Sequence, residues 1–187
     1  MFAFAINVKI VAKVDDAIIT SYDIEKRIEI SKIFNPQAFK NVSSQEIKAM
    51  ILEKMIQEKM LFKMARENNF IISEAELNET ISQISSSSNN LKGKNLKSVF
   101  GEEGYNSFKE QTKGEIIFNA MLSGMAKEKL NFTKEEIVRF KNTYNQENAK
   151  KINDQEAENI LKSIKINELQ QQIIKNLQES STIEKFN

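Results

Sequence analysis

The stretch Lys9-Ile-Val-Ala-Lys-Val-Asp-Asp-Ala-Ile-Ile-Thr-Ser-Tyr-Asp-Ile24 decides how the fold begins. Two apolar runs rich in β-branched residues flank Asp15-Asp16, and Asp tolerates the positive φ that a tight hairpin turn needs. The second run leads without a break into Thr20-Ser21, which is typical of a helix start. The stretch therefore predicts a β-hairpin over residues 8–19 that feeds directly into a helix.

Helix starts of one kind recur along the chain. A capping box pairs Ser or Thr with an acidic residue three positions later, and the chain shows this pattern at Thr20/Asp23, Ser43/Glu46, Ser73/Glu76 and Thr133/Glu136. Together with apolar periodicity and breaker residues, these starts predict helices over 21–34, 44–68, 74–85, 95–100, 105–130, 134–146, 155–164 and 167–180, with a turn at 101–104.

The last residues of the sequence have the alternating side-chain pattern of a β-strand. Ser181 to Phe186 reads as a closing strand, and a hairpin alone is marginally stable, so we expect residues 182–186 to pair with the N-terminal hairpin. The predicted fold is mainly α, with a small antiparallel sheet formed by the hairpin and the C-terminal strand. The stretch 142–154 is rich in Asn, Lys and Gln and is the best candidate for a linker.

Composition excludes several classes of function. The 187 residues carry 27 basic and 26 acidic side chains, so the net charge of +1 gives no general attraction to nucleic acid. Without His or Cys, the chain lacks the nucleophile–imidazole pairs and the usual zinc ligands. We expect no catalytic residue, no metal and no cofactor. No apolar run reaches the roughly 20 residues that span a bilayer, so we also expect no stable membrane insertion.

The helix over 44–68 is apolar around most of its circumference. Four of the seven Met residues lie here, and flexible Met side chains suit surfaces that accept many apolar shapes. The candidate binding residues on this helix and on the helix over 105–130 are Met50, Met55, Met60, Phe62, Met64, Phe118, Met121 and Met125. The alternative is that these residues fill gaps in the core. A narrow stripe of basic side chains on the helix over 44–68 indicates a face exposed to solvent. The alternative is a binding site for an anion.

Three further segments carry a resemblance to a known family. Ile51 to Leu61 resembles a long helix of the SurA-type periplasmic chaperones, and Ala65 to Leu77 resembles the helix end and next helix start that follow it in that family. Phe100 to Gln111 resembles the Gly/Tyr/Phe/Gln motif ahead of the family's second long helix. With the opening hairpin, four segments occur in the family's order and spacing over residues 8–146.

The resemblance implies an ATP-independent periplasmic chaperone that holds unfolded polypeptides, above all precursors of outer-membrane proteins. Parvulin isomerase domains follow this region in many family members, and their sites normally use His. The resemblance therefore implies a chaperone core without prolyl isomerase activity, acting as a monomer or weak homodimer. The alternative is a helical docking protein that binds one folded partner.

The expected organisation has three parts. Residues 1–7 form an N-terminal tail, in which Ala3-Phe4-Ala5 fits the end of a signal peptide, although it also fits an ordinary apolar N-terminus. Residues 8–146 form the SurA-like domain. Residues 147–187 form a linker, helices and a strand that pack back on that domain.

Overall fold

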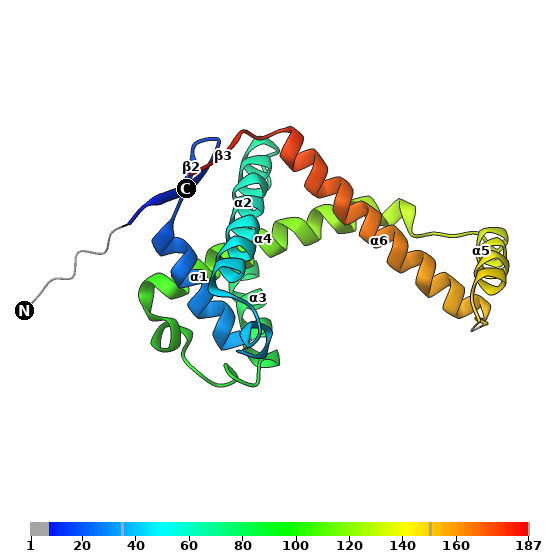
Figure 1. Ribbon diagram of the computed structural model, residues 1–187, viewed down its shortest axis with the longest axis horizontal. Coiled ribbons are helices and arrows are strands. Elements are labelled where there is room, and N and C mark those ends of the chain that lie inside the picture. The colour runs from blue at the N-terminus through cyan, green and yellow to red at the C-terminus, as the bar shows by residue number, and fades with distance from the viewer. Residues whose placement is uncertain (1–7, 35, 150, 187) are drawn as a thin grey trace, which may run out of the picture. The chain divides into compact units, whose positions relative to one another are not determined.

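The computed structural model describes residues 8–34, 36–149 and 151–186. In chain order the elements are β1 (Ile10–Val14), β2 (Ala17–Thr20), α1 (Ser21–Phe34), the 3-10 helix η1 (Pro36–Phe39), α2 (Ser44–Glu67), α3 (Glu74–Ser87), α4 (Leu96–Lys129), α5 (Lys134–Glu147), α6 (Asp154–Glu179) and β3 (Ile183–Lys185) (Figure 1). The expected mainly α fold with a small antiparallel sheet is confirmed. The signal-peptide hypothesis for Met1–Ala5 lies outside the described residues.

The chain divides by packing into two compact units. One comprises Met1–Ile117 and Leu177–Asn187, and the other comprises Phe118–Asn176. Because α4 and α6 each contribute to both units, the units are joined by continuous helices. The domain boundaries expected from the sequence stay a prediction.

The sheet joins the two ends of the chain. Asp15 takes a positive φ of 51° in the turn between β1 and β2, as the Asp-Asp link predicts. The strand order is β2-β1-β3, and β3 pairs antiparallel with β1, with Val14 opposite Ile183 and Ala12 opposite Lys185. The predicted pairing of the C-terminal strand with the N-terminal hairpin is confirmed.

A clasp around Asp15 reinforces this pairing. The backbone N–H of Asp15 donates to the Thr182 carbonyl at 2.9 Å, and the Thr182 N–H donates to the Asp15 carboxylate at 3.1 Å. Lys63 of α2 lies 3.2 Å from the same carboxylate and also donates to the Ser180 carbonyl. The turn, α2 and the C-terminal segment therefore meet at one carboxylate.

The core of the first unit lies beneath the sheet and between its helices. Ala12, Val14 and Ile19 are almost fully buried on one face of the sheet, and α2 contacts both β1 and β2. A second cluster joins α1, α3 and α4 through Ile30, Leu77, Ile81 and Phe108. The rings of Phe34, Phe100 and Phe108 pack beside it with centroids 5.3 to 6.2 Å apart.

Capping explains where most of the helices begin. Reciprocal hydrogen bonds complete the boxes at Thr20/Asp23, Ser43/Glu46 and Thr133/Glu136, whereas at Ser73 the side chain caps the Glu76 N–H. Asn153 and Glu156 form a further reciprocal pair at the start of α6. This last box was missed because it uses Asn rather than Ser or Thr, although Asn is an equally good cap.

Three expectations about helix boundaries were wrong. The two helices over 155–164 and 167–180 are one helix, α6, because no Gly or Pro interrupts them. The linker over 142–154 is shorter, since α5 continues to Glu147. The turn over 101–104 is confined to Gly101, whose φ of 71° and ψ of 174° break α4 while the residues after it are already helical.

The second unit contains the C-terminal part of α4, α5 and most of α6. The Asn145 side chain of α5 bonds the backbone of Ile152 through both its oxygen and its nitrogen, and Lys141 pairs with Asp154 at 2.6 Å. These contacts fix the connection between α5 and α6. Among the described helices, none is both long and apolar enough to cross a membrane.

Acid should weaken the clasp at Asp15. The hydrogen bond from Thr182, supported by Lys63, outweighs the effect of burial and lowers the pKa of Asp15. Its contribution to stability is therefore complete above the usual pKa of about 3.9 and is lost as the pH falls through the lower folded value. We expect Asp15→Asn, which tolerates the same φ, to reduce the free energy of unfolding by less than about 1 kcal/mol near neutral pH.

Urea unfolding measured from neutral pH to about pH 2 checks this expectation, because the difference between wild type and Asp15→Asn should shrink toward zero at the acid end. Asp16→Asn, in the same turn, is the matched control and should leave the profile of the wild type unchanged. A difference that grows toward acid pH would contradict the assignment.

Candidate functional site

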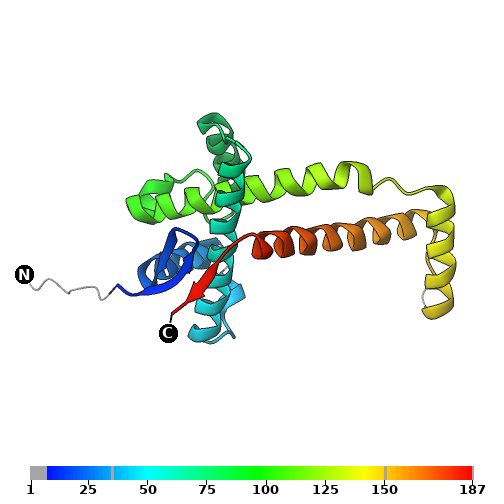
Figure 2. The same ribbon diagram turned by 90° about the horizontal axis from the view of Figure 1, so that it is seen from above.

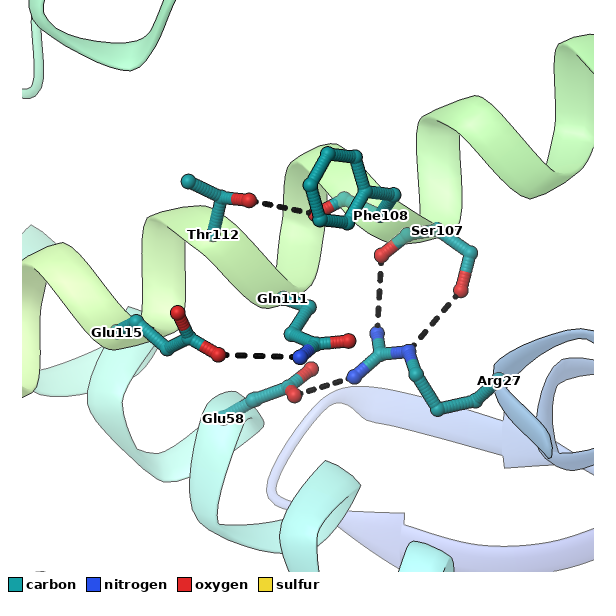
Figure 3. A network of polar contacts seen from close by, with 7 residues as sticks. All are labelled: Arg27, Glu58, Ser107, Phe108, Gln111, Thr112 and Glu115. Atoms are coloured by element: carbon teal, nitrogen blue, oxygen red, sulfur yellow. Dashed lines mark hydrogen bonds and ion pairs between the residues drawn. The ribbon is translucent and has the colours of Figure 1, made fainter. Parts of the chain in front are cut away.

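A buried ion pair holds three helices of the first unit together. Arg27 of α1 pairs with Glu58 of α2, and the two side chains are only 4% and 12% exposed. Arg27 also donates to the Ser107 hydroxyl of α4 at 3.2 Å and to the Ser107 carbonyl at 3.1 Å, as Figure 3 shows. The guanidinium therefore bonds acceptors on both α2 and α4. A buried charge requires such partners, because it has lost its hydration.

Helices α2 and α4 approach each other closely beside this pair. A Cβ added to Gly114 would lie 3.0 Å from the Glu58 Cγ, so glycine permits the crossing that is visible in Figure 2. Near it, Thr112 is fully buried and donates to the Phe108 carbonyl at 3.0 Å. Gln111 donates to Glu115 at 3.0 Å, as Figure 3 also shows.

A hollow of the first unit with a largely apolar lining, pocket A, has a volume of about 250 Å³. Its walls come from α1, η1, α2 and α4, together with the segment between η1 and α2. The apolar lining consists of Phe34, Phe39, Val42, Met50 and Ile51, and the polar lining consists of Ser31, Lys54 and Gln111. An apolar hollow with a few polar groups suits a large apolar side chain with part of a backbone.

The second hollow, pocket B, has a volume of about 280 Å³. Its apolar lining consists of Phe62, Ala65, Phe70, Ile72 and Ile117, and its charged lining consists of Arg66, Glu110 and Lys113. On α2, Glu58 falls between the residues of pocket A and those of pocket B, whereas on α4 the residues of the two pockets overlap along the helix near Gly114. On α2 the buried ion pair therefore lies between the residues of the two pockets.

The predicted binding residues lie in different places: some line a pocket, some belong to the core, and some lie in the second unit. Met50 is 53% exposed and lines pocket A, and Phe62 lines pocket B. Met55 and Met60 are 5% and 1% exposed and belong to the core, whereas Met64 is half-buried outside both pockets. Phe118, Met121 and Met125 are half-buried in the second unit.

Sequence reasoning missed most of the pocket residues and the ion pair. Phe39 and Val42 lie in a segment that was treated only as a connection, yet three apolar residues close behind a Pro are unusual for a solvated loop. The sequence pattern around Arg27 indicates more clearly that this side chain is buried. It lies three residues from both Ile24 and Ile30, so it interrupts the apolar stripe of α1, and both neighbours are buried.

The comparisons with known proteins concern this same part of the chain. The model of the SurA N-terminal domain family matches residues 8–121, which run from β1 into α4 and contain both pockets. The chain belongs to the SurA N-terminal domain family. This match confirms the resemblance expected from the hairpin and the three later segments.

Two relatives named Chaperone SurA are similar to the chain. The protein of Methylobacillus flagellatus is 27% identical over 143 residues, which cover 75% of this chain and 32% of the relative. That of Alcanivorax borkumensis is 24% identical over 135 residues, covering 71% of this chain and 31% of the relative. The matched region thus spans about a third of the length of these relatives of the SurA family.

Removing Arg27 should destabilise the first unit strongly. Arg27→Met leaves the Glu58 carboxylate without its partner in a mostly buried site, and such a loss costs about 3–5 kcal/mol. The double variant Arg27→Met/Glu58→Met removes both charges, so it should cost clearly less than the sum of the two single changes.

Urea unfolding of the four proteins of this cycle measures the coupling between the two side chains. Lys26→Met is the matched control, because Lys26 is a neighbour whose ion pair with Glu29 is exposed, and it should cost less than about 1 kcal/mol. Strictly additive effects in the cycle would show that the ion pair does not hold the helices together.

Proposed function

We propose that this protein is an ATP-independent chaperone that holds unfolded polypeptides in the periplasm, outer-membrane protein precursors among them. The observation that carries the proposal is the presence of pockets A and B within the region that belongs to the SurA N-terminal domain family. Two relatives that carry the name Chaperone SurA support it.

The chemistry of the pockets suits unselective binding of unfolded chains. Each pocket offers aromatic and aliphatic walls with a few polar or charged groups, so a client can insert an apolar side chain while its backbone stays near polar partners. Met50 is half-exposed in pocket A and flexible enough to fit different shapes. No nucleotide takes part in this proposal, since burial of apolar surface alone drives such binding.

Of the predicted binding residues, Met50 and Phe62 have the most direct role in the proposal. Met64 of the first unit is half-buried, as are Phe118, Met121 and Met125 of the second unit, and they stay candidate binding residues. Met55 and Met60 would contact a client only after local opening of the helices, because both are buried. The proposed acting form is a monomer or a weak homodimer.

The runner-up function is a docking module for one folded partner. Its support is that pocket A is a defined hollow with specific polar residues, which could recognise a single side chain. The two functions differ in selectivity, because a chaperone binds several unrelated unfolded chains whereas a docking module ignores them.

Changing pocket A should weaken the holding of clients. We expect the wild type to delay the aggregation of a diluted, denatured barrel protein, as followed by light scattering. Met50→Gln keeps the length of the side chain but removes its apolar end. Burial of one such side chain contributes about 1–2 kcal/mol, so a several-fold higher concentration should be needed for the same delay.

Ile71→Gln is the matched control, because Ile71 is 85% exposed and lines neither pocket. It should delay aggregation as well as the wild type does. No delay by the wild type at several-fold molar excess, with several unrelated clients, would favour the docking module instead. Equal effects of the two variants would show that exposed apolar surface in general, and not pocket A, binds clients.

We also expect no prolyl isomerase activity from this chain. The sequence contains no His, which the parvulin sites of related chaperones normally use. A protease-coupled peptide assay should show a rate that does not rise with the concentration of this protein, whereas an added parvulin raises it. Catalysis in proportion to the protein concentration would contradict this part of the proposal.

A further inference from the structure

The strand β2 forms an edge of the sheet, and its register fixes which of its backbone groups point outward. Val14 and Ala17 flank the two-residue turn, so they form a hydrogen-bonded pair, and the next pair, Lys13 and Ile18, does not. The N–H and C=O of Ile18 therefore point away from β1, toward the free edge.

The neighbouring outward position supports this assignment. Thr20 has the same orientation as Ile18, and its N–H donates to the Asp23 carboxylate at 2.8 Å in the helix cap. Ile18 thus presents the open backbone donor and acceptor of β2, with a side chain that is 50% exposed. The residues of β2 carry no charge, whereas β3, at the other edge, has Glu184 and Lys185. Charged side chains protect an edge from further pairing, so β2 is the less protected of the two edges, with Ile18 as its open position.

A polar hollow of about 390 Å³ adjoins this edge, and we refer to it as the β2 pocket. Ile18 lines it together with side chains of α1, α2 and α4. The other lining residues are Tyr22, Asp23, Lys26, Arg27, Met55, Lys59, Glu103, Asn106, Ser107 and Glu110.

The charges of the β2 pocket leave one cation available. Its carboxylates already have partners, since Asp23 caps α1, Glu103 accepts from Tyr22, and Glu110 pairs with Lys113. Two of its cations pair with Glu29 and Glu58. In the described part of the chain, Lys59 pairs with no carboxylate, and its ammonium lies over the ring of Phe62, 5.6 Å from the centroid. Lys59 is therefore the cation of this pocket that can still pair with a carboxylate of a bound chain.

We propose that an extended segment of a bound polypeptide adds to the edge of β2, bonding the backbone of Ile18 and directing a carboxylate side chain toward Lys59. Strand addition supplies main-chain hydrogen bonds that do not depend on sequence, and an adjacent pocket then selects side chains. This inference rests on the proposed function, and it names a mode of binding separate from pockets A and B.

A proline substitution separates the backbone contact from the side chain. Proline is tolerated in an edge strand where its nitrogen faces away from the sheet, so Ile18→Pro removes the outward N–H and leaves the pairing with β1 intact. Ile18→Thr loses the same apolar side chain but keeps the N–H, which makes it the matched control. The probe is a fluorescent peptide, Thr-Val-Glu-Val-Thr, whose binding is followed by anisotropy.

We expect Ile18→Pro to bind the peptide about five-fold or more weakly than Ile18→Thr does, the effect of one lost hydrogen bond. N-methylation of the central peptide residue should weaken binding to the wild type, a result that no misfolded variant can imitate. Equal affinities of the two Ile18 variants, both melting as the wild type does, would overturn the proposal, as would unchanged binding of peptides methylated at each position in turn.

The charge contact is tested with the same peptide and its Gln analogue. Lys59→Gln should weaken binding of the Glu peptide about two- to five-fold and leave the Gln peptide unaffected. Lys48→Gln, on an exposed face of the same helix, should change neither. Equal effects of Lys59→Gln on both peptides would overturn the role of Lys59.

The two proposals can fail separately. If the wild type delays aggregation but Ile18→Pro and Ile18→Thr bind the peptide alike, strand addition is wrong and the chaperone function stands. If the wild type neither delays aggregation nor binds the peptide, both proposals are wrong.

Discussion

The arrangement of the first unit depends on one charge buried among apolar side chains. Arg27 lies in the apolar stripe of α1, and its guanidinium reaches Glu58 on α2 and Ser107 on α4. Apolar packing alone would let these helices slide against one another, because it has no direction. A planar group with several fixed donors allows little such freedom, so the ion pair sets the orientation of the helices at their junction.

The contact between α2 and α4 also affects the surface of the first unit. Glycine at position 114 lets α4 approach α2 closely at Glu58. On α2, residues before Glu58 line pocket A and residues after it line pocket B, while α4 contributes residues near Gly114 to both pockets. Both hollows therefore have residues of the two crossing helices in their walls, and other segments complete them: α1, η1 and the residues that follow η1 in pocket A, and the residues that follow α2 in pocket B. Strand addition at β2 would add a directional contact to these unselective ones.

The sequence predicts the local features of this fold well and the distant ones poorly. The Asp-Asp turn, the capping boxes and the break at Gly101 follow from residues within a few positions of one another. The closing strand was predictable because an isolated hairpin needs a further partner. Periodicity could not show that α6 runs unbroken, nor that Arg27 meets Glu58 and Ser107, since these partners lie far along the chain. Pockets A and B depend on such distant contacts, so only Met50 and Phe62 among their residues were anticipated.

The pairing of Val14 with Ile183 has a consequence for how the molecule folds. It closes a loop that contains nearly the whole chain, and the entropic cost of closing a loop increases with its length. The hairpin and the helices behind it can form from nearby residues, whereas the second partner of the central strand β1 comes from the distant residues 183–185. During folding, β1 therefore remains open on one side until residues 183–185 dock. Contacts between residues far apart in the chain slow folding, so we expect the docking of β3 to be a late and slow step of folding.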